Sequence, residues 1–455
     1  MNQTERMGNE HIGRLIFSMS APAMISMLIN ALYNIVDSIF VGRYSTDAFT
    51  AVSLVFPLQQ LVIAVAVGTA VGVNSLIARR LGARMRGEAE DAARHGIVLA
   101  VLSGLVFMVI GFGLSRAFLS AFTTNPTVLE QAVSYSHIAV GLSFFVMISI
   151  MCEKIQQATG NMIIPMIQGL TGTIINIVLD PIMIFGLLGC PELGVRGAAI
   201  ATIIGQIGGM LVGIYAVFFH QKALNCSMRR LKLNIRTILE IYQVGLPGII
   251  MQSVVSVMTS GLNMILISYS EIAVSVLGLY FKLQTFVFMP VFGLNQGALP
   301  VMGYNYGAGD RKRLMSAYRV TVAAAFAIMV TGLIVFQTIP DKMIRLFNDD
   351  PALLAAGVPA LKTISLSFLG AAFGIINSTL FQAIGRGMAS LIVSVCRQLG
   401  IILPAAWILG RLFGLHAIWF AFPIAEIGSF FISFALLYRI YQKELKYLQP
   451  RVSEE

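Results

Sequence analysis

Long apolar runs, separated by short polar segments, follow one another along almost the whole chain. A helix needs about 20 apolar residues to cross the hydrocarbon core of a bilayer. Twelve runs reach that length, so we predict an all-α integral membrane protein with twelve transmembrane helices. The runs lie near 15–40, 48–77, 92–115, 128–152, 162–186, 196–219, 238–268, 272–300, 316–337, 353–380, 388–409 and 415–438.

The composition agrees with this class. Hydrophobic residues make up 57% of the 455 positions and charged residues only 11%, and the mean hydropathy is +0.82. A soluble domain cannot bury that much apolar surface. The polar first 14 residues contain no short apolar region with a cleavage site, so we do not expect a removable signal peptide. The cysteines have neither metal nor disulfide spacing, and we interpret all four as packing residues: Cys152, Cys190, Cys226 and Cys396.

The net charge of +10 is explained by its distribution and does not require a nucleic-acid partner. If the N-terminus is cytoplasmic, 22 of the 31 Lys and Arg residues fall in inside segments and six in outside segments. Cytoplasmic loops of membrane proteins carry such an excess of positive charge. The pattern therefore predicts a multi-pass protein of the plasma or inner cell membrane with both termini in the cytoplasm.

The chain contains an internal repeat. Residues 225 positions apart often have the same type, as Pro22 and Pro247 do, and "QATG" at 157 matches "QAIG" at 382. Each repeat holds six helices, so both copies enter and leave on the same side, and we expect two pseudo-symmetric bundles around a cavity, as in transporters. We predict an N-lobe over 1–219, a cytoplasmic linker over 220–237 and a C-lobe over 238–455. Glycines also match, in the pairs Gly68 and Gly293, Gly72 and Gly297, and Gly82 and Gly307.

Several polar residues interrupt the apolar helices of the first copy. A charge at the bilayer centre costs about 2.5–3.5 kcal/mol on insertion scales, so such residues usually mark function. Asn34 and Asp37 share one face of the first helix, and Asn176 and Asp180 share one face of the fifth. Asp37 and, on the sixth helix, Thr202 should lie ~9 Å below the outer surface and Asp180 ~13 Å, at ~1.5 Å per residue, so three helices place polar ligands in one layer.

These residues predict a site for a coupling ion. Pro181 has no amide N–H, so we expect a bend in the fifth helix and an available carbonyl at Ile177. Two carboxylates, an amide, a hydroxyl and this carbonyl suit a hard cation such as sodium, while crowded carboxylates with raised pKa values suit a proton. We expect Na⁺ or H⁺ at Asp37, Asn176, Asp180 and Thr202, and no other metal or cofactor. The alternative for Asp37 is a helix cap near solvent.

The second copy acts as an internal control. At positions 225 further on, Asp37 becomes Leu262, Asn176 becomes Ile401 and Asp180 becomes Ala405. The last helix pair matches at 220, where Thr202 becomes Phe422. The fold therefore does not require these polar groups.

Other polar residues carry weaker signals. Lys282 and Arg397 of the second copy could either contact substrate or bind one lobe to the other. Glu153 and Lys154 favour an interfacial ion pair. Candidates for the substrate cavity are Tyr135, Met251, Lys282 and Gln284.

The sequence resembles the multidrug and toxic compound extrusion (MATE) family over about residues 12–440. The resemblance rests on "SAPAMISMLINALYNIVDSIFVG", "QATGN" at 157–161, "NIVLDP" with "GVRGAAIAT", and "GYNYGAGDRKR" at 303–313. It implies two six-helix bundles that export cationic amphiphilic compounds in exchange for sodium or protons.

The resemblance also implies roles for particular residues. In the prokaryotic branch with a first-lobe ion site, the matching positions are Asp37, Asn176, Asp180 and Thr202, with Pro22 at a helix bend and Tyr135 nearby. The other branch carries an acidic residue in the seventh helix, where "PGIIMQSVVSV" has none. This difference argues against a second-lobe cation site.

Alternatives come from other classes. A lipid-linked oligosaccharide flippase of the same superfamily would need a strongly cationic cavity, and a major-facilitator carrier is suggested by "RRLGARMRGE" at 79–88. An enzyme is not expected, because no HExxH, DDxxD or GxSxG motif occurs. We expect a monomer in the lipid bilayer, with a small amphiphilic substrate and no nucleic-acid partner.

Overall fold

A computed structural model describes residues 3–44, 46–221, 223–347 and 349–449. Within these ranges the side chains of residues 33–44, 46–49 and 230 are not described. The described residues form helices and loops and contain no strand. Ten helical segments in these ranges are long and apolar enough to cross a membrane, and two bent helix pairs bring the spans to twelve. The predicted all-α fold with twelve transmembrane helices is confirmed.

The helices follow one another in two series. The first series is α1 (Gln3–Asn9), α2 (Ile12–Tyr44), α3 (Thr46–Gly82), α4 (Arg86–Val109), α5 (Ser115–Ser120), α6 (Pro126–Ala139), α7 (Phe144–Ala158), α8 (Ile163–Phe185) and α9 (Val195–Tyr215). The second series is α10 (Ile235–Ile267), α11 (Glu271–Gly307), α12 (Arg311–Thr338), α13 (Pro340–Arg345), α14 (Pro351–Ser365), α15 (Phe368–Ala383), α16 (Gly387–Val395), α17 (Leu403–Phe413), α18 (Leu415–Ile418) and α19 (Ala421–Lys443). Single π-helical turns at Ile110–Leu114, Ala216–His220 and Cys396–Ile402 extend or join some of these helices.

The repeat seen in the sequence is also present in the helix boundaries. The limits of α3 and α11 differ by 225 at both ends, as do the first residues of α4 and α12. The fourth span of each copy was predicted as one helix but is broken, by 41° between α6 and α7 and by 49° between α14 and α15. Apolar content alone gives the length of a span and cannot reveal such a bend.

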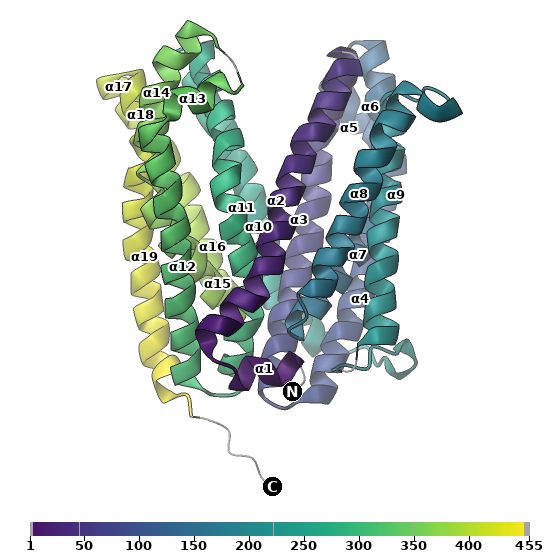
Figure 1. Ribbon diagram of the computed structural model, residues 1–455, viewed down its shortest axis with the longest axis vertical. Helices are drawn as coiled ribbons and strands as arrows, with labels where there is room; N and C mark the ends of the chain where they lie inside the picture. The colour runs from purple at the N-terminus through teal and green to yellow at the C-terminus, as the bar shows by residue number, and fades with distance from the viewer. Residues whose placement is uncertain (1–2, 45, 222, 348, 450–455) are drawn as a thin grey trace.

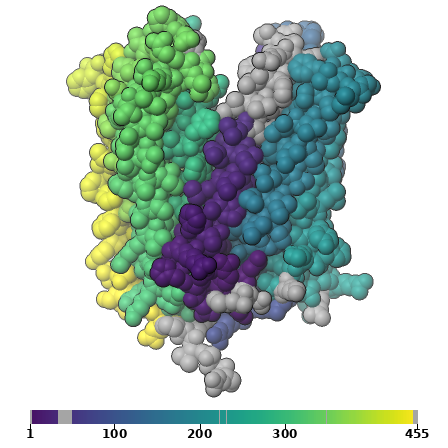
Figure 2. Space-filling view, in the orientation of Figure 1, coloured from purple at the N-terminus to yellow at the C-terminus, as the bar shows by residue number. Residues whose placement is uncertain are grey.

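The two series form two bundles that meet at one end and diverge at the other (Figure 1). α1 and the end of α19 lie at the joined end. A wedge-shaped cleft between the bundles opens at the opposite end (Figure 2). The two predicted six-helix bundles are therefore present, while the lobe limits at 219 and 238 stay predictions.

The matched glycines lie where the bundles meet. A Cβ atom at Gly82 would collide with the carbonyl of Tyr304, and one at Gly307 would collide with the carbonyl of Arg79. Residues 79 and 304 are themselves 225 apart, as are residues 82 and 307. Each copy therefore presents the same glycine to the same backbone position of the other.

Two further glycine pairs repeat this reciprocal packing along the surface where the two bundles meet, which we call the seam. A Cβ at Gly68 would lie 2.7 Å from the backbone nitrogen of Ile249, and one at Gly293 would lie 2.5 Å from that of Met24. A Cβ at Gly72 would lie 3.0 Å from the backbone nitrogen of Gly245, and its match Gly297 meets Ser20. Small residues allow helix backbones to approach closely in membranes. The three pairs thus explain why the glycines occur in both copies.

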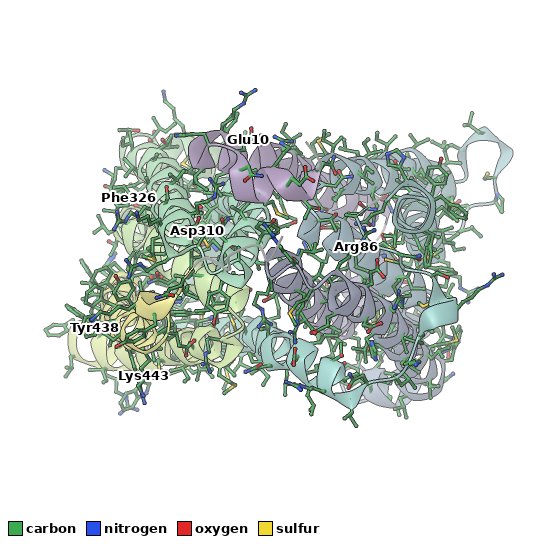
Figure 3. The ribbon with its side chains drawn as sticks, turned by 90° about the horizontal axis from the view of Figure 1, so that it is seen from below. Glu10, Arg86, Asp310, Phe326, Tyr438 and Lys443 are labelled. Carbon is green, nitrogen blue, oxygen red and sulfur yellow. The ribbon has the colours of Figure 1, made fainter. Side chains whose placement is uncertain are left out.

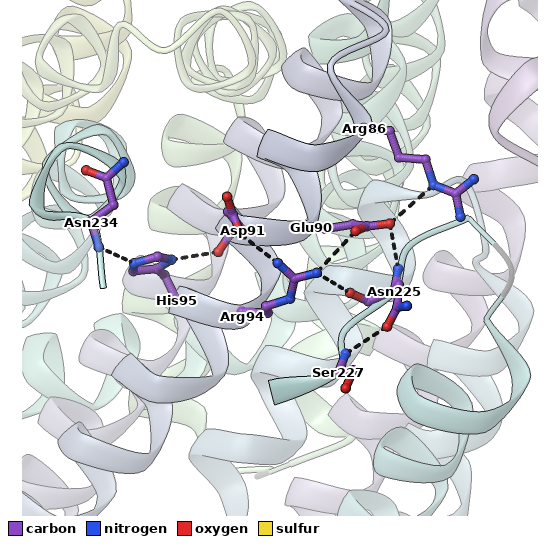
Figure 4. Close-up of polar contacts among 8 residues, drawn as sticks. All are labelled: Arg86, Glu90, Asp91, Arg94, His95, Asn225, Ser227 and Asn234. Carbon is purple, nitrogen blue, oxygen red and sulfur yellow. Dashed lines mark hydrogen bonds and ion pairs between the residues drawn. The ribbon is translucent and has the colours of Figure 1, made fainter. Parts of the chain in front are cut away.

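The segment between the bundles is fixed to the start of α4 (Figure 4). Arg94 donates to the carbonyl of Asn225 at 2.9 Å, and the Asn225 N–H donates to Glu90 at 3.0 Å. His95 accepts from the Asn234 N–H through Nε2 at 2.8 Å. The predicted linker is therefore held against the first bundle by its backbone.

Cys226 lies in this segment and is 3% exposed. Burial raises the pKa of its thiol to about 12. Cys226 is therefore a neutral packing residue, as predicted, and Cys152 is also buried. The prediction is wrong for Cys190, which is exposed.

Replacing Gly82 by Ala should destabilise the seam. The added methyl group has no room beside the Tyr304 carbonyl, and overpacking costs about 1–3 kcal/mol. We expect a lower melting temperature of the purified protein, and the same for Gly307→Ala. Gly87→Ala is the control, because nothing lies within 4 Å of a Cβ at Gly87. Equal melting temperatures for all three variants would contradict the close approach at the seam.

Candidate functional site

The structure joins two of the predicted site residues directly. Asn176 on α8 donates through Nδ2 to Thr202 Oγ1 on α9, at 3.1 Å, and Thr202 donates to the Ala198 carbonyl at 2.9 Å. Asn176 is 3% exposed. The pair therefore connects two neighbouring helices inside the first bundle.

Small residues bring α8 and α9 close enough for this bond. A Cβ at Gly205 would lie 2.6 Å from the Gly172 carbonyl and 3.3 Å from Asn176 Cβ. A Cβ at Gly197 would collide with the carbonyl of Met183. The local sequence "GVRGAAIATIIG" thus allows the close helix contact that sets the Asn176–Thr202 distance.

Asp180 lies one turn beyond Asn176 on α8 and is 1% exposed. A carboxylate buried this deeply in a membrane protein needs a proton, a cation or hydrogen-bond donors. α8 continues through Pro181 to Phe185, so the proline does not end the helix. A bend at Pro181 stays a prediction.

The predicted residues of the first helix cannot be compared in the same way. The side chains of Asn34 and Asp37 lie outside the part that the structure describes. Their helix, α2, contains Pro22 and continues through it, and α2 packs against α8. The bend predicted at Pro22 stays a prediction.

The candidates for the substrate cavity come from both bundles. Tyr135 on α6 is 6% exposed, and Gln59 of α3 donates to its hydroxyl at 3.3 Å. Met251 on α10 and Gln284 on α11 are half-buried, and Lys282 is exposed. Tyr135 is thus part of the packed first bundle, and the other three lie on the two helices that begin the second.

A buried polar cluster crosses the seam near the end of α7. The Lys154 ammonium donates to Glu153 at 3.0 Å, and it also donates to Gln296 of α11 at 3.0 Å. Gln157 donates to the same Gln296 oxygen at 2.9 Å. Glu153 and Lys154 do form the predicted ion pair. The sequence did not predict the link of these residues to Gln296 in the other bundle. The available signal was that Gln296 lies next to Gly297, which matches Gly72 in the repeat.

Arg397 forms an ion pair within its own bundle. It donates to Glu426 at 2.8 Å within the second bundle, and Glu426 is 8% exposed. The partner of Arg397 in this ion pair thus belongs to the same bundle and not to the other one, while a contact with substrate stays a prediction.

No group of three His, Cys, Asp or Glu side chains among the described residues is arranged to hold a metal ion. A cation at the described part of the predicted site would therefore depend on the amide, the hydroxyl and Asp180. An amide oxygen, a hydroxyl and a carboxylate are ligands that hard cations accept.

Two repeated membrane bundles, a seam at one end and a cleft at the other define a membrane transport protein. The family model MatE matches residues 22–182 and again residues 247–408, two ranges whose starts differ by 225 and whose ends differ by 226. The chain belongs to the MATE family of transporters. It is therefore not an enzyme, and the major-facilitator alternative does not apply.

Known relatives cover nearly the whole chain. "Multidrug export protein MepA" of Staphylococcus haemolyticus is 27% identical over 433 residues, which is 94% of each chain. A solved structure described as an outward-facing conformation of a multidrug resistance MATE transporter has a TM-score of 0.92 at 26% identity, and covers 97% of this chain and 98% of that one. A Pyrococcus furiosus transporter of the MOP superfamily, with a reported reverse polarity of its binding pocket, has a TM-score of 0.91 at 26% identity over the same shares.

Replacing Gln296 of the second bundle by Leu should weaken the contact between the two bundles at the seam. The change leaves Lys154 and Gln157 without their shared acceptor, and buried unpaired donors cost about 1–3 kcal/mol. We expect a lower melting temperature of the purified protein. Gln284→Leu on the same helix is the control, since the described part of the structure records no hydrogen bond of its side chain. Equal stability of both variants would show that the cluster does not hold the bundles together.

Proposed function

We propose that this protein exports amphiphilic, mostly cationic compounds across the cell membrane in exchange for sodium ions or protons. Two observations support export of a substrate. A cleft lies between the two bundles, and the curated relatives are named as multidrug export proteins. The Asn176–Thr202 pair beside the buried Asp180 carries the proposal of ion coupling.

The asymmetry of the repeat supports this assignment. The polar residues of the first bundle are replaced in the second by Ile401, Ala405 and Phe422. Ile401 and Ala405 are partly buried apolar residues that pack against the second hydrophobic core. The second bundle keeps its fold without them, which argues that they serve coupling and not folding.

Helix register supports adding Asp37 to this group. A Cβ at Gly169 of α8 would lie 3.0 Å from Ser26 Oγ of α2, so these two positions are level. As the first and fifth spans, both helices run in the same direction. Positions 37 and 180 lie eleven residues beyond the contact, ~16 Å further along each helix at ~1.5 Å per residue. We expect the two aspartates at similar depth.

Ion binding would act on the seam between the bundles. An antiporter needs a ligand site whose affinity differs between its two open states, because only differential binding can shift that equilibrium. Opening the other end requires the glycine contacts and the Lys154 cluster to separate. An ion bound between α8 and α2 could favour one arrangement, since α2 packs on both α8 and α11.

The substrate is expected to contact the beginning of the second bundle. Met251, Lys282 and Gln284 lie on α10 and α11, and none is fully buried. A lipid-linked oligosaccharide flippase is less well supported, because a strongly cationic cleft is needed and Glu426 already neutralises Arg397. Oligosaccharide flipping without drug export would favour that second candidate.

We propose that the seam faces the cytoplasm and the cleft opens outward, with the protein acting as a monomer. The charge asymmetry supports this orientation, since both ends of the described chain lie at the basic end (Figure 1). A cysteine placed at position 232 of the linker should resist labelling by an impermeant thiol reagent in intact cells. Rapid labelling from outside would contradict the orientation.

Asp37→Asn and Asp180→Asn should abolish gradient-driven export while the protein still inserts and folds. Each change keeps the side-chain volume and removes a charge that is costly in the bilayer. Efflux in everted vesicles, at matched protein levels, measures the loss under a sodium gradient and then under a pH gradient. The gradient that drives the unchanged protein identifies the coupling ion.

Two variants serve as controls for this experiment. Lys282→Gln should change which compounds are exported and keep the ion dependence. Leu262→Asp, which places a carboxylate at the matching position of the second copy, should not restore coupling to Asp37→Asn. Full coupled transport by Asp37→Asn would contradict its assignment to the ion site.

A further inference from the structure

An open pocket of about 460 Å³ lies at the seam end of the second bundle, away from the cleft. It is formed where α12 begins and α19 ends, with Arg311, Lys312, Ser316 and Arg319 on one side and Tyr441 on the other. Figure 3, seen from below, shows the labelled end of α19 beside the start of α12. The pocket is therefore at the boundary where both helices leave the membrane.

The pocket is cationic and its charges are not neutralised within the protein. None of its lining residues is acidic, and no ion pair among the described residues includes Arg311, Lys312 or Arg319. The acidic residues that flank the lining residues in the chain have other partners, because Glu444 pairs with Arg386 and Asp310 caps the start of α12.

The position of Arg311 is fixed by a backbone carbonyl in the turn after α19, on the opposite side of the pocket. Its Nη1 donates to the Lys446 carbonyl at 2.9 Å, which links the start of α12 to the turn after α19. A guanidinium has five N–H donors in a fixed plane, so others remain for a second acceptor. Three cations and two hydroxyl groups form a set of donors that matches the oxygens of a phosphate ester.

An apolar surface continues from the pocket along both helices. Phe326 lies two turns beyond Arg319 on the same face of α12 and is 46% exposed. Tyr438 and Phe434 precede Tyr441 on one face of α19 and are 59% and 53% exposed. Figure 3 shows Phe326 and Tyr438 on the same outer edge of the second bundle. A ligand with a phosphate group and acyl chains would fit both parts.

We propose that this pocket binds the headgroup of an anionic phospholipid, with its acyl chains along α12 and α19. Basic pockets between transmembrane helices at the membrane boundary bind such headgroups. Lys312 and Arg319 hold the phosphate, and Arg311 positions it through its link to Lys446. The site is separate from the transport cleft and does not depend on the proposed antiport.

The test compares lipid binding by two variants that lose the same charge at the same end. Lys312→Gln with Arg319→Gln removes two cations from the pocket. Arg229→Gln with Lys232→Gln removes two exposed cations from the linker. Native mass spectrometry measures retention of phosphatidylglycerol and phosphatidylcholine by each protein. We expect the unchanged protein and the linker variant to retain phosphatidylglycerol preferentially, and the pocket variant to lose this preference by roughly tenfold.

A second measurement separates lipid from free phosphate and guards against misfolding. Phosphatidylglycerol should raise the melting temperature of the unchanged protein and of the linker variant, because a ligand of the folded state stabilises it. The pocket variant should keep its melting temperature in detergent and lose this increase. Glycerol phosphate, which lacks acyl chains, should not reproduce it. Equal lipid retention by both variants, or displacement of the lipid by glycerol phosphate, would overturn the proposal. If the double pocket variant does not fold, Lys312→Gln alone should show a partial loss of lipid retention.

Discussion

The close approach of helix backbones at glycine is the constraint on which the rest of this structure depends. Gly82 and Gly307 each face a carbonyl of the other copy, and no side chain fits between them. A bilayer supplies little hydrophobic force between helices, so close van der Waals packing must hold the bundles together. The bundles meet near one end and diverge at the other, which leaves the cleft that transport requires.

The bilayer also decides how polar groups are distributed. Charges inside the bundles are paired within the protein, as Arg397 is with Glu426 and Lys154 is with Glu153. In each pair the opposite charges compensate each other where lipid could not solvate them, so the fold tolerates them. Asp180 lies one turn from Asn176 on α8, and the Asn176 amide bonds to Thr202 of α9.

Sequence periodicity and the repeat were sufficient to predict most of the fold. The length of each apolar run gave the twelve spans, since a bilayer imposes one length on every helix. The 225-residue register gave two bundles and located the seam glycines before their role was known. Asn176 and Thr202 were assigned to one site from the sequence, and the structure places them in hydrogen-bond contact, while their role in ion binding stays a prediction. The bends between α6 and α7 and between α14 and α15 were not predicted, because hydropathy carries no information on helix direction.

The sequence by itself determined the class of protein, the number of spans, the duplication and the asymmetric polar residues, because each is a property of residue type and spacing. Only the tertiary structure decided which residues meet. It linked Lys154 to Gln296 across the seam, paired Arg397 with Glu426, and placed Arg311 opposite Tyr441 at a basic pocket. These partners are 29 to 142 residues apart in the chain, and the rotation of each helix about its own axis, which packing sets, brings them together.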